Sequence, residues 1–207
     1  MVDSVHSKTR AVKRSRRNRE KPGHRTGESL RVLISEARLR RRVKQLAREI
    51  RRDFPKSELH LVGVLKGSVF FLADLARELR GEVSFDFIGV SSYGSSTDST
   101  GEVKLTKDLD VSIESRTVIL VEDILDTGLT LKYLLRLFEE RRPKHLRSVV
   151  LFDKVERRIA DVKADYTGFQ IPNEFVVGYG LDFDQRYRNL PAVCILRLSS
   201  NRKPKEQ

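Results

Sequence analysis

Short apolar segments alternate with amphipathic segments through the middle of this chain. The apolar segments are predicted strands, and helical patterns lie between or after them: strands at 60–65, 82–90, 116–121 and 147–153, helices at 68–79 and 128–141. Each apolar segment is continuous, which is typical of a strand buried on both faces of a sheet. Strands that alternate with helices form a mainly parallel, twisted sheet with right-handed crossovers and helices on both faces. The pattern therefore predicts an α/β fold.

The N-terminal part of the predicted domain adds a strand and a helix. A short apolar lead-in at 31–34 is followed by Ser35 and Glu36, which are typical of a helix N-terminus. Apolar side chains then recur at steps of four, three and four residues until Pro55 ends the helix: Leu39, Val43, Leu46 and Ile50. The arginine and lysine side chains between them are predicted to face solvent.

The pattern changes after the last long strand. Beyond Val155 it consists of short strands and turns, at 169–172, 175–179 and 192–196. We therefore predict one domain over 29–207 with two parts. The α/β core occupies about 55–153, and a small β-rich hood subdomain is built from 29–54 and 154–198.

The first 28 residues are predicted to be a disordered basic tail. They have almost no large apolar side chains, so they cannot bury enough surface to offset the cost of ordering. They hold nine lysine and arginine residues against three acidic ones, which is half of the chain's formal net charge of +12. A solubilising tail, nonspecific contact with nucleic acid and a transit peptide are the three interpretations that the composition allows.

Cysteine usage bears on the cellular compartment. Cys194 is the only cysteine, which excludes an intrachain disulfide, and its place in an apolar run predicts a core residue. No cluster of cysteine and histidine has metal-ligand spacing. The few cysteines, the lack of an apolar leader and the lack of an apolar run of roughly 18 residues predict a cytoplasmic protein without membrane contact.

The segment 118–131 (VILVEDILDTGLTL) combines a strand end, carboxylates and a helix start. Its apolar strand ends at Glu122 and Asp123, and a loop at 126–130 then opens a helix. In open α/β sheets the ligand crevice lies at the carboxyl ends of the strands, and a Gly- and Thr-containing loop at a helix N-terminus suits a phosphate. The alternative is an ordinary strand–turn–helix with acidic caps. Carboxylates beside a phosphate cradle would repel the ligand unless they had a task, which favours a functional site.

The same segment resembles the phosphoribosyl-pyrophosphate-binding motif of the purine/pyrimidine (type I) phosphoribosyltransferases. Further segments resemble the hypoxanthine(-guanine) phosphoribosyltransferases of this family, in the same order along residues 30–198: 62–68 (VGVLKGS), 91–94 (SSYG), Lys154, 175–182 (FVVGYGLD) and Arg188. The resemblance implies purine salvage, in which hypoxanthine, and guanine as well, receives the 5-phosphoribosyl group and pyrophosphate leaves. It also implies Mg²⁺ as the cofactor and IMP or GMP as the product.

For the phosphoribosyl group, the resemblance implies that Glu122 and Asp123 hold the ribose hydroxyls, directly or through Mg²⁺. Asp126 would be the general base or acid that faces N7 of the purine. The 5′-phosphate would be bound by the loop backbone and hydroxyls of Asp126, Thr127, Gly128, Leu129 and Thr130. Some relatives have lysine at the position of Leu129, so no charged contact is expected there.

For pyrophosphate, the resemblance implies binding by Leu65, Lys66 and Gly67, across a nonproline cis peptide bond. Arg188 would also contact pyrophosphate. Asp182 would coordinate a second Mg²⁺ that touches the pyrophosphate.

For the purine, the resemblance implies that Lys154 donates to the exocyclic O6 and that Phe175 stacks on the ring. The backbone of Val176 would meet the base edge, and carbonyls near Val176 and Asp182 would read the atom at purine C2. That atom separates hypoxanthine and guanine from xanthine, so xanthine as the preferred base stays open.

The loop at 91–101 is rich in serine, threonine and glycine and is expected to close as a lid, with Ser92 and Tyr93 at its start. Closure would keep water from the oxocarbenium-like centre that develops at the sugar. A passive hairpin tip is the alternative. The resemblance further implies a homodimer or homotetramer, and an RNA-binding regulator on the same fold is the rival that the basic charge suggests.

Overall fold

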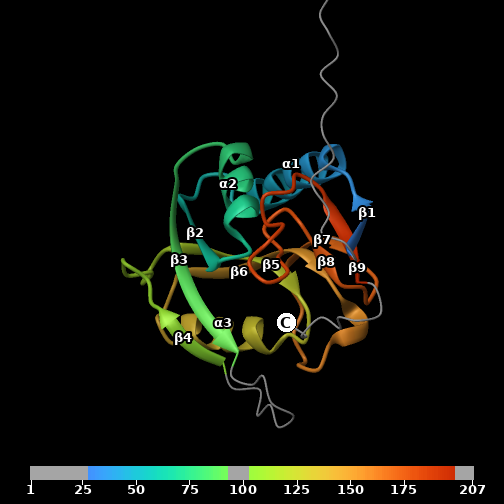
Figure 1. Cartoon of the computed structure of the whole chain (residues 1–207). Coiled ribbons are helices and arrows are strands. Elements are labelled where there is room, and N and C mark those ends of the chain that lie inside the picture. The colour runs from blue at the N-terminus through green and yellow to red at the C-terminus, as the bar shows by residue number, and fades with distance from the viewer. Residues whose placement is uncertain (1–27, 93–102, 199–207) are drawn as a thin grey trace, which may run out of the picture.

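A computed structural model describes residues 28–92 and 103–198, and its centre is a six-stranded sheet (Figure 1). The strand order is β4-β3-β2-β5-β6-β7, and β4 is the antiparallel member at one edge. The strands are β2 (Leu59–Leu65), β3 (Val83–Ser92), β4 (Val103–Lys107), β5 (Thr117–Leu125), β6 (His145–Asp153) and β7 (Tyr166–Gln170). The other five strands run parallel, so the carboxyl ends of β2 and β5 meet at one edge of the sheet.

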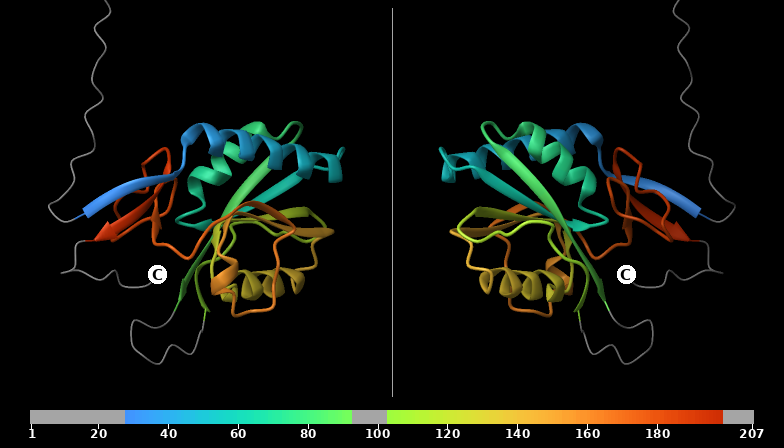
Figure 2. Two further views of the ribbon diagram at one scale, coloured as in Figure 1. Left: turned by 90° about the vertical axis from the view of Figure 1, so that its right-hand side faces the viewer. Right: turned by 90° about the vertical axis from the view of Figure 1, so that its left-hand side faces the viewer.

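Helices cover both faces of this sheet, as the views from the side show (Figure 2). Helices α1 (Glu36–Asp53) and α2 (Val69–Glu78) lie on one face, and α3 (Leu129–Glu139) lies on the other. Strand β5 explains the continuous apolar pattern: Ile119 and Val121 pack on the first side, whereas Val118 and Leu120 pack on the second. The α/β fold predicted from the sequence is confirmed. None of the described helices could cross a membrane.

A second, three-stranded antiparallel sheet lies beside the large one (Figures 1 and 2). It has the order β1-β9-β8, from β1 (Glu28–Ile34), β9 (Val193–Leu198) and β8 (Val176–Val177). Its own apolar cluster includes the buried Cys194. We call this sheet and the turns between β8 and β9 the hood.

The structure differs from the expected division of the chain in three places. Helix α1, assigned to the hood, packs with α2 against the large sheet, in an apolar cluster that also includes Val176 and Val193 of the hood. Strand β7, expected near 169–172 in the hood, pairs parallel with β6 at the edge of the large sheet. Glu28, assigned to the tail, begins β1 and accepts a hydrogen bond from Arg186. The rest of the predicted tail lies outside the described residues.

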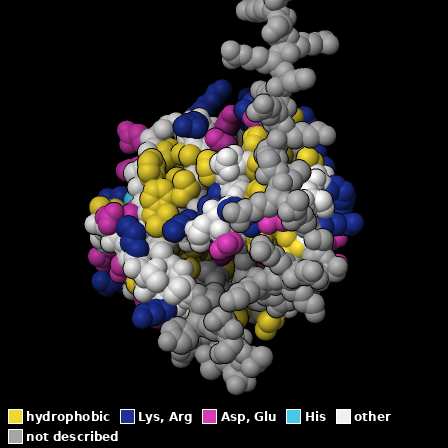
Figure 3. Space-filling view, in the orientation of Figure 1, with side chains coloured by type: hydrophobic (Ala, Val, Ile, Leu, Met, Phe, Trp, Pro, Cys, Tyr) yellow, Lys and Arg dark blue, Asp and Glu magenta, His cyan; other side chains and the backbone are white. Residues whose placement is uncertain are grey.

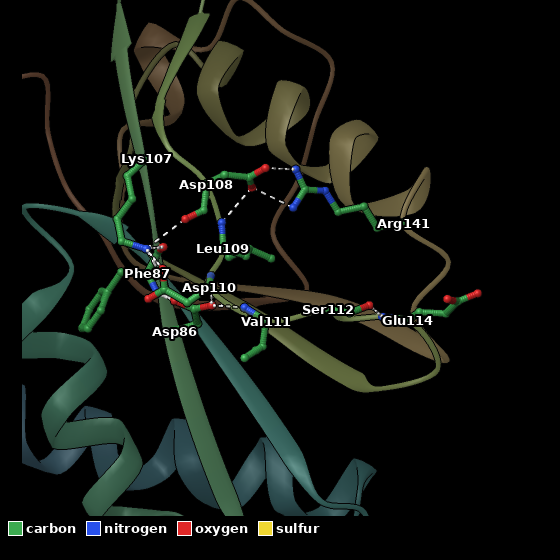
Figure 4. Close-up of polar contacts among 10 residues, drawn as sticks. All are labelled: Asp86, Phe87, Lys107, Asp108, Leu109, Asp110, Val111, Ser112, Glu114 and Arg141. Atoms are coloured by element: carbon green, nitrogen blue, oxygen red, sulfur yellow. Dashed lines mark hydrogen bonds and ion pairs between the residues drawn. The ribbon is translucent and has the colours of Figure 1, made fainter.

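Asp86 in β3 ties the β4–β5 connection to the sheet (Figure 4). Its buried carboxylate accepts hydrogen bonds from the backbone N–H groups of Phe87 (2.6 Å), Asp110 (2.7 Å) and Val111 (3.3 Å). The ammonium group of Lys107 lies 3.8 Å away. Burial alone would raise the pKa of Asp86, but the backbone donors and the Lys107 charge outweigh burial and lower that pKa.

We expect Asp86→Ala to lower the free energy of unfolding by about 2–4 kcal/mol at neutral pH, because backbone N–H groups lose a buried acceptor. A carboxyl whose pKa is lower in the folded protein contributes stability above its ordinary pKa, and this contribution is lost as pH falls through the folded value. The difference from wild type should therefore shrink towards about pH 3 in urea unfolding. The exposed Asp110→Ala should cost less than about 1 kcal/mol. An equally small loss for Asp86→Ala would contradict this role.

Candidate active site

Strand β5, the loop after it and the start of α3 form the first wall of the site. Glu122 and Asp123 lie near the carboxyl end of β5. Gly128 adopts a left-handed conformation, with φ of 86°, just before α3. The Lys132 N–H donates to the Gly128 carbonyl at 3.0 Å. The amide groups of residues 129–131 precede that bond and have no intrahelical acceptor. The helix therefore offers N–H groups and a positive dipole end to an anion.

The chain after β6 clamps this loop from behind. The Lys154 N–H donates to the Leu125 carbonyl at 2.9 Å, and the N–H groups of Ile159 and Ala160 donate to the Thr127 carbonyl at 2.9 and 3.0 Å. These bonds fix the loop from outside and do not use its first-turn amides, of which that of Leu129 makes only a long hydrogen bond of 3.5 Å to Oγ1 of Thr127.

Arg158 is the centre of this clamp, and it was not identified from the sequence. Its guanidinium donates to the carbonyls of Asp126 (3.1 Å) and Leu125 (3.3 Å) and pairs with the carboxylate of Asp153. A Cβ on Gly128 would lie 2.8 Å from Cδ of Arg158, so a glycine is required both for the conformation and for this contact.

Strand β2 supplies the second wall, through the segment that follows it. The peptide bond between Leu65 and Lys66 is cis, as the resemblance implied. A Cβ on Gly67 would lie 1.7 Å from Oδ2 of Asp123, and a Cβ on Gly180 would lie 1.9 Å from the Gly67 carbonyl oxygen. Gly67 is therefore enclosed between the end of β5 and the turn after β8. The sequence did not single out Gly180.

Asp182 and Arg188 extend this wall from the hood. Nη2 of Arg188 lies 2.7 Å from Oδ1 of Asp182, and its Nη1 donates to the Gly180 carbonyl at 2.6 Å. The charges of both side chains act on the pKa of Asp123, so they lie within electrostatic range of it. The structure thus brings Arg188, Asp182, Gly67 and Asp123 together, although they come from distant parts of the chain.

The two acidic residues of β5 have strongly shifted pKa values. Burial, with a further contribution from the charge of Asp123, raises the pKa of Glu122 to about 8. Burial raises the pKa of Asp123 to about 6, against the opposing effect of backbone N–H groups and Arg188. Oε2 of Glu122 is buried and has no hydrogen-bond partner among the described residues. Both carboxyls would therefore be stabilised in their charged form by an added cation.

Lys154, Asp126 and Arg157 form a charged cluster on the other side of the loop. Lys154 is buried, and burial lowers its pKa; the charge of Asp126 opposes this shift and that of Arg157 adds to it. Nε of Arg157 lies 2.7 Å from Oδ1 of Asp126. Lys154 and Asp126 were predicted to act together, whereas Arg157 was not identified from the sequence.

The hood holds the two residues predicted to meet the purine ring. The ring of Phe175 packs edge-on against the ring of Phe183, with centroids 5.7 Å apart. The backbone carbonyl of Phe175 accepts a hydrogen bond from the Leu196 N–H. Val176 is buried and pairs with Ile195 in β9. These residues are positioned by the hood, whereas Asp126 and Lys154 are positioned by the large sheet.

The predicted lid lies mostly beyond the described part of the chain. Ser92 is the last residue of β3 and pairs with Val103 of β4. Tyr93 and the rest of the loop fall outside the described residues.

Comparisons with known proteins agree with this architecture. Residues 34–184 match the model of the phosphoribosyl transferase domain. The hypoxanthine-guanine phosphoribosyltransferase of Bacillus subtilis (strain 168) is 49% identical over 166 residues, which cover 80% of this chain and 92% of that protein.

Two solved structures resemble the chain along most of their length. A Bacillus anthracis hypoxanthine-guanine phosphoribosyltransferase aligns with a TM-score of 0.77 and 50% identity, over 81% of this chain and 99% of that one. A Trypanosoma cruzi hypoxanthine phosphoribosyltransferase in a ternary substrate complex aligns with a TM-score of 0.76 and 44% identity, over 80% and 94%. Their shared fold and sequence identity establish that this chain belongs to the hypoxanthine-guanine phosphoribosyltransferase family.

Proposed function

We propose that the protein transfers the 5-phosphoribosyl group from phosphoribosyl pyrophosphate to hypoxanthine, and to guanine, with release of pyrophosphate. One observation carries this proposal: an open helix N-terminus, two buried carboxyls and the Lys66–Gly67 segment converge at the carboxyl edge of the large sheet. The relatives of 49% and 50% identity are named for hypoxanthine and guanine, and the relative of 44% identity is named for hypoxanthine.

At the phosphoribosyl end, the loop of residues 126–130 binds the 5′-phosphate with its amides and hydroxyls. Glu122 and Asp123 hold the ribose hydroxyls. Leu65, Lys66, Gly67 and Arg188 bind pyrophosphate, where cationic and N–H groups stabilise the charge that develops on the leaving group.

The residues of the site also fit Mg²⁺. Among the described residues no group of three acidic, histidine or cysteine side chains could hold a metal ion unaided. Mg²⁺ typically binds through one or two carboxylates together with substrate oxygens. Glu122 and Asp123 supply such carboxylates, with pKa values raised by burial, and Asp182 supplies one on the pyrophosphate side. When bound, Mg²⁺ would neutralise charge on the departing pyrophosphate.

At the base end, Asp126 accepts the proton from N7 of the purine while N9 forms the bond to the sugar. Lys154 donates to O6, Phe175 stacks on the ring, and the Val176 backbone meets the base edge. A lysine that reads O6 favours 6-oxopurines over adenine, because the amino group at that position of adenine is a donor.

The purified protein is expected to form IMP when it is given hypoxanthine, phosphoribosyl pyrophosphate and Mg²⁺. An absence of product would refute the proposed activity. A comparison of rates with hypoxanthine, guanine and xanthine would establish the base preference, because these purines differ at C2.

We expect Arg158→Gln to raise the KM for phosphoribosyl pyrophosphate by roughly 10-fold, since the loop loses two carbonyl contacts worth about 1 kcal/mol or more together. The KM for hypoxanthine should change less, because Arg158 braces the phosphate loop from behind. Steady-state kinetics with each substrate varied in turn would measure both values. An equal change in both KM values would show that Arg158 acts on the whole fold.

We further propose a cytoplasmic homodimer or homotetramer. Large apolar side chains are exposed on α2 (Phe70, 44%) and β3 (Phe85, 58%), and Figure 3 shows apolar atoms gathered where these elements lie. Such surfaces are typical of contacts between subunits. Sedimentation equilibrium would measure the assembly, and a monomer at micromolar concentration would contradict it.

A further inference from the structure

Arg157 contacts the proposed general base without forming an aligned hydrogen bond. Its Nε lies 2.7 Å from Oδ1 of Asp126, and the two side chains are 28% and 26% exposed. Both atoms are buried, yet within the described part of the chain neither has a partner with hydrogen-bond geometry. The two atoms are therefore held together as an ion pair without hydrogen-bond geometry, and such a buried pair calls for an explanation in a native structure.

The position of Arg157 is fixed by backbone bonds. Its N–H donates to the Lys154 carbonyl at 3.0 Å and closes the short 3-10 helix η1 (Val155–Arg157). The Lys154 N–H in turn donates to Leu125, and residues 159 and 160 donate to Thr127. The turn that carries Arg157 is thus attached on both sides to the loop that carries Asp126.

We propose that Arg157 is a positioning residue for Asp126, which holds the buried Oδ1 by charge and so leaves the other carboxylate oxygen, Oδ2, to face the N7–H group of the purine. The contact also offsets the charge of Asp126 close to Lys154, so that the Lys154 ammonium is available to O6. This inference rests on the proposed function, because it requires Asp126 to act on the purine.

Arg157→Gln should lower kcat by roughly 10- to 100-fold, since displacement of a catalytic group by about 1 Å can cost that much. The KM for phosphoribosyl pyrophosphate should stay within about twofold, because the phosphate loop keeps its own contacts. Arg157→Lys keeps the charge and should restore kcat to within about fivefold of wild type. The matched control is Arg136→Gln, whose exposed side chain on α3 pairs only with Glu140 among the described residues, and it should behave as wild type.

Inhibition by two unreactive purine analogues tests the same contact without catalysis. 9-Deazahypoxanthine keeps the N7–H donor, whereas 7-deazahypoxanthine has a carbon at that position. The wild-type protein should bind the first analogue more tightly by about 10-fold, and Arg157→Gln should lose most of this preference. A merely structural role would weaken both analogues equally.

Two outcomes overturn the inference: Arg157→Gln with kcat and analogue preference near wild type, or Arg157→Lys as slow as Arg157→Gln. If the glutamine variant fails to fold, the lysine variant still decides, because near-normal activity supports the role of charge and a large loss refutes it. A wild-type protein that makes no IMP would instead refute the proposed function, so the two failures are distinguishable.

Discussion

Replacing Asp126 with asparagine is expected to lower kcat by roughly 10²–10⁴-fold, the range typical of a lost general base. Asparagine has the same size and can still occupy the loop, but its amide cannot take up the N7 proton. The phosphate contacts proposed for the loop come from backbone N–H groups, which the substitution retains. The KM for phosphoribosyl pyrophosphate should therefore change by no more than about threefold.

Steady-state kinetics with both substrates would test this separation. Asp161→Asn is the matched control, because Asp161 is an exposed carboxylate in the same clamp segment. It should keep wild-type kcat and KM. A kcat for Asp126→Asn close to that of the control would remove Asp126 from the base role, and a loss confined to KM would assign it to binding alone.

The part of the site that could be predicted from the sequence is local in the chain. The continuous apolar run before Glu122 and Asp123 predicted a buried strand, and the glycine and threonine residues after it predicted a loop at a helix start. The structure confirms the strand, the loop and the helix start in β5 and α3. Each of them depends on a few neighbouring residues: the strand on burial of its apolar side chains, and the helix start on the left-handed conformation of Gly128.

The residues that could not be predicted act across folded contacts. Arg157 and Arg158 follow Lys154 in a turn with no distinctive spacing, and their effect depends on how this turn folds back onto the β5–α3 loop. Gly180 matters only because the hood brings it against Gly67. Strand β7 was assigned to the wrong sheet because a short strand does not specify its partner.

Glu122→Gln is expected to stabilise the ligand-free protein while it lowers activity. The pKa of Glu122 is raised to about 8 in the folded protein, from an ordinary value of 4.5. Between these two values the folded state holds the proton more tightly than the unfolded state does, so stability is full below the lower value and is lost as pH rises through the higher one. A neutral glutamine avoids this loss. The loss amounts to about 2–4 kcal/mol at pH 8, because each unit of difference between the folded and unfolded pKa corresponds to about 1.4 kcal/mol.

The same substitution removes a carboxylate proposed to hold the ribose and Mg²⁺, so kcat/KM should fall by at least about 10-fold. Thermal unfolding at about pH 5 and pH 8 would measure the first effect, since the gain should be present at the higher pH and nearly absent at the lower. Glu139→Gln, an exposed carboxyl on α3, should change neither stability nor activity. If the difference in stability between Glu122→Gln and wild type were the same at both pH values, the pKa of the buried carboxyl would not be raised in the free protein. Relief of the cost of burying a charged Glu122 would then not contribute to the binding of a cation.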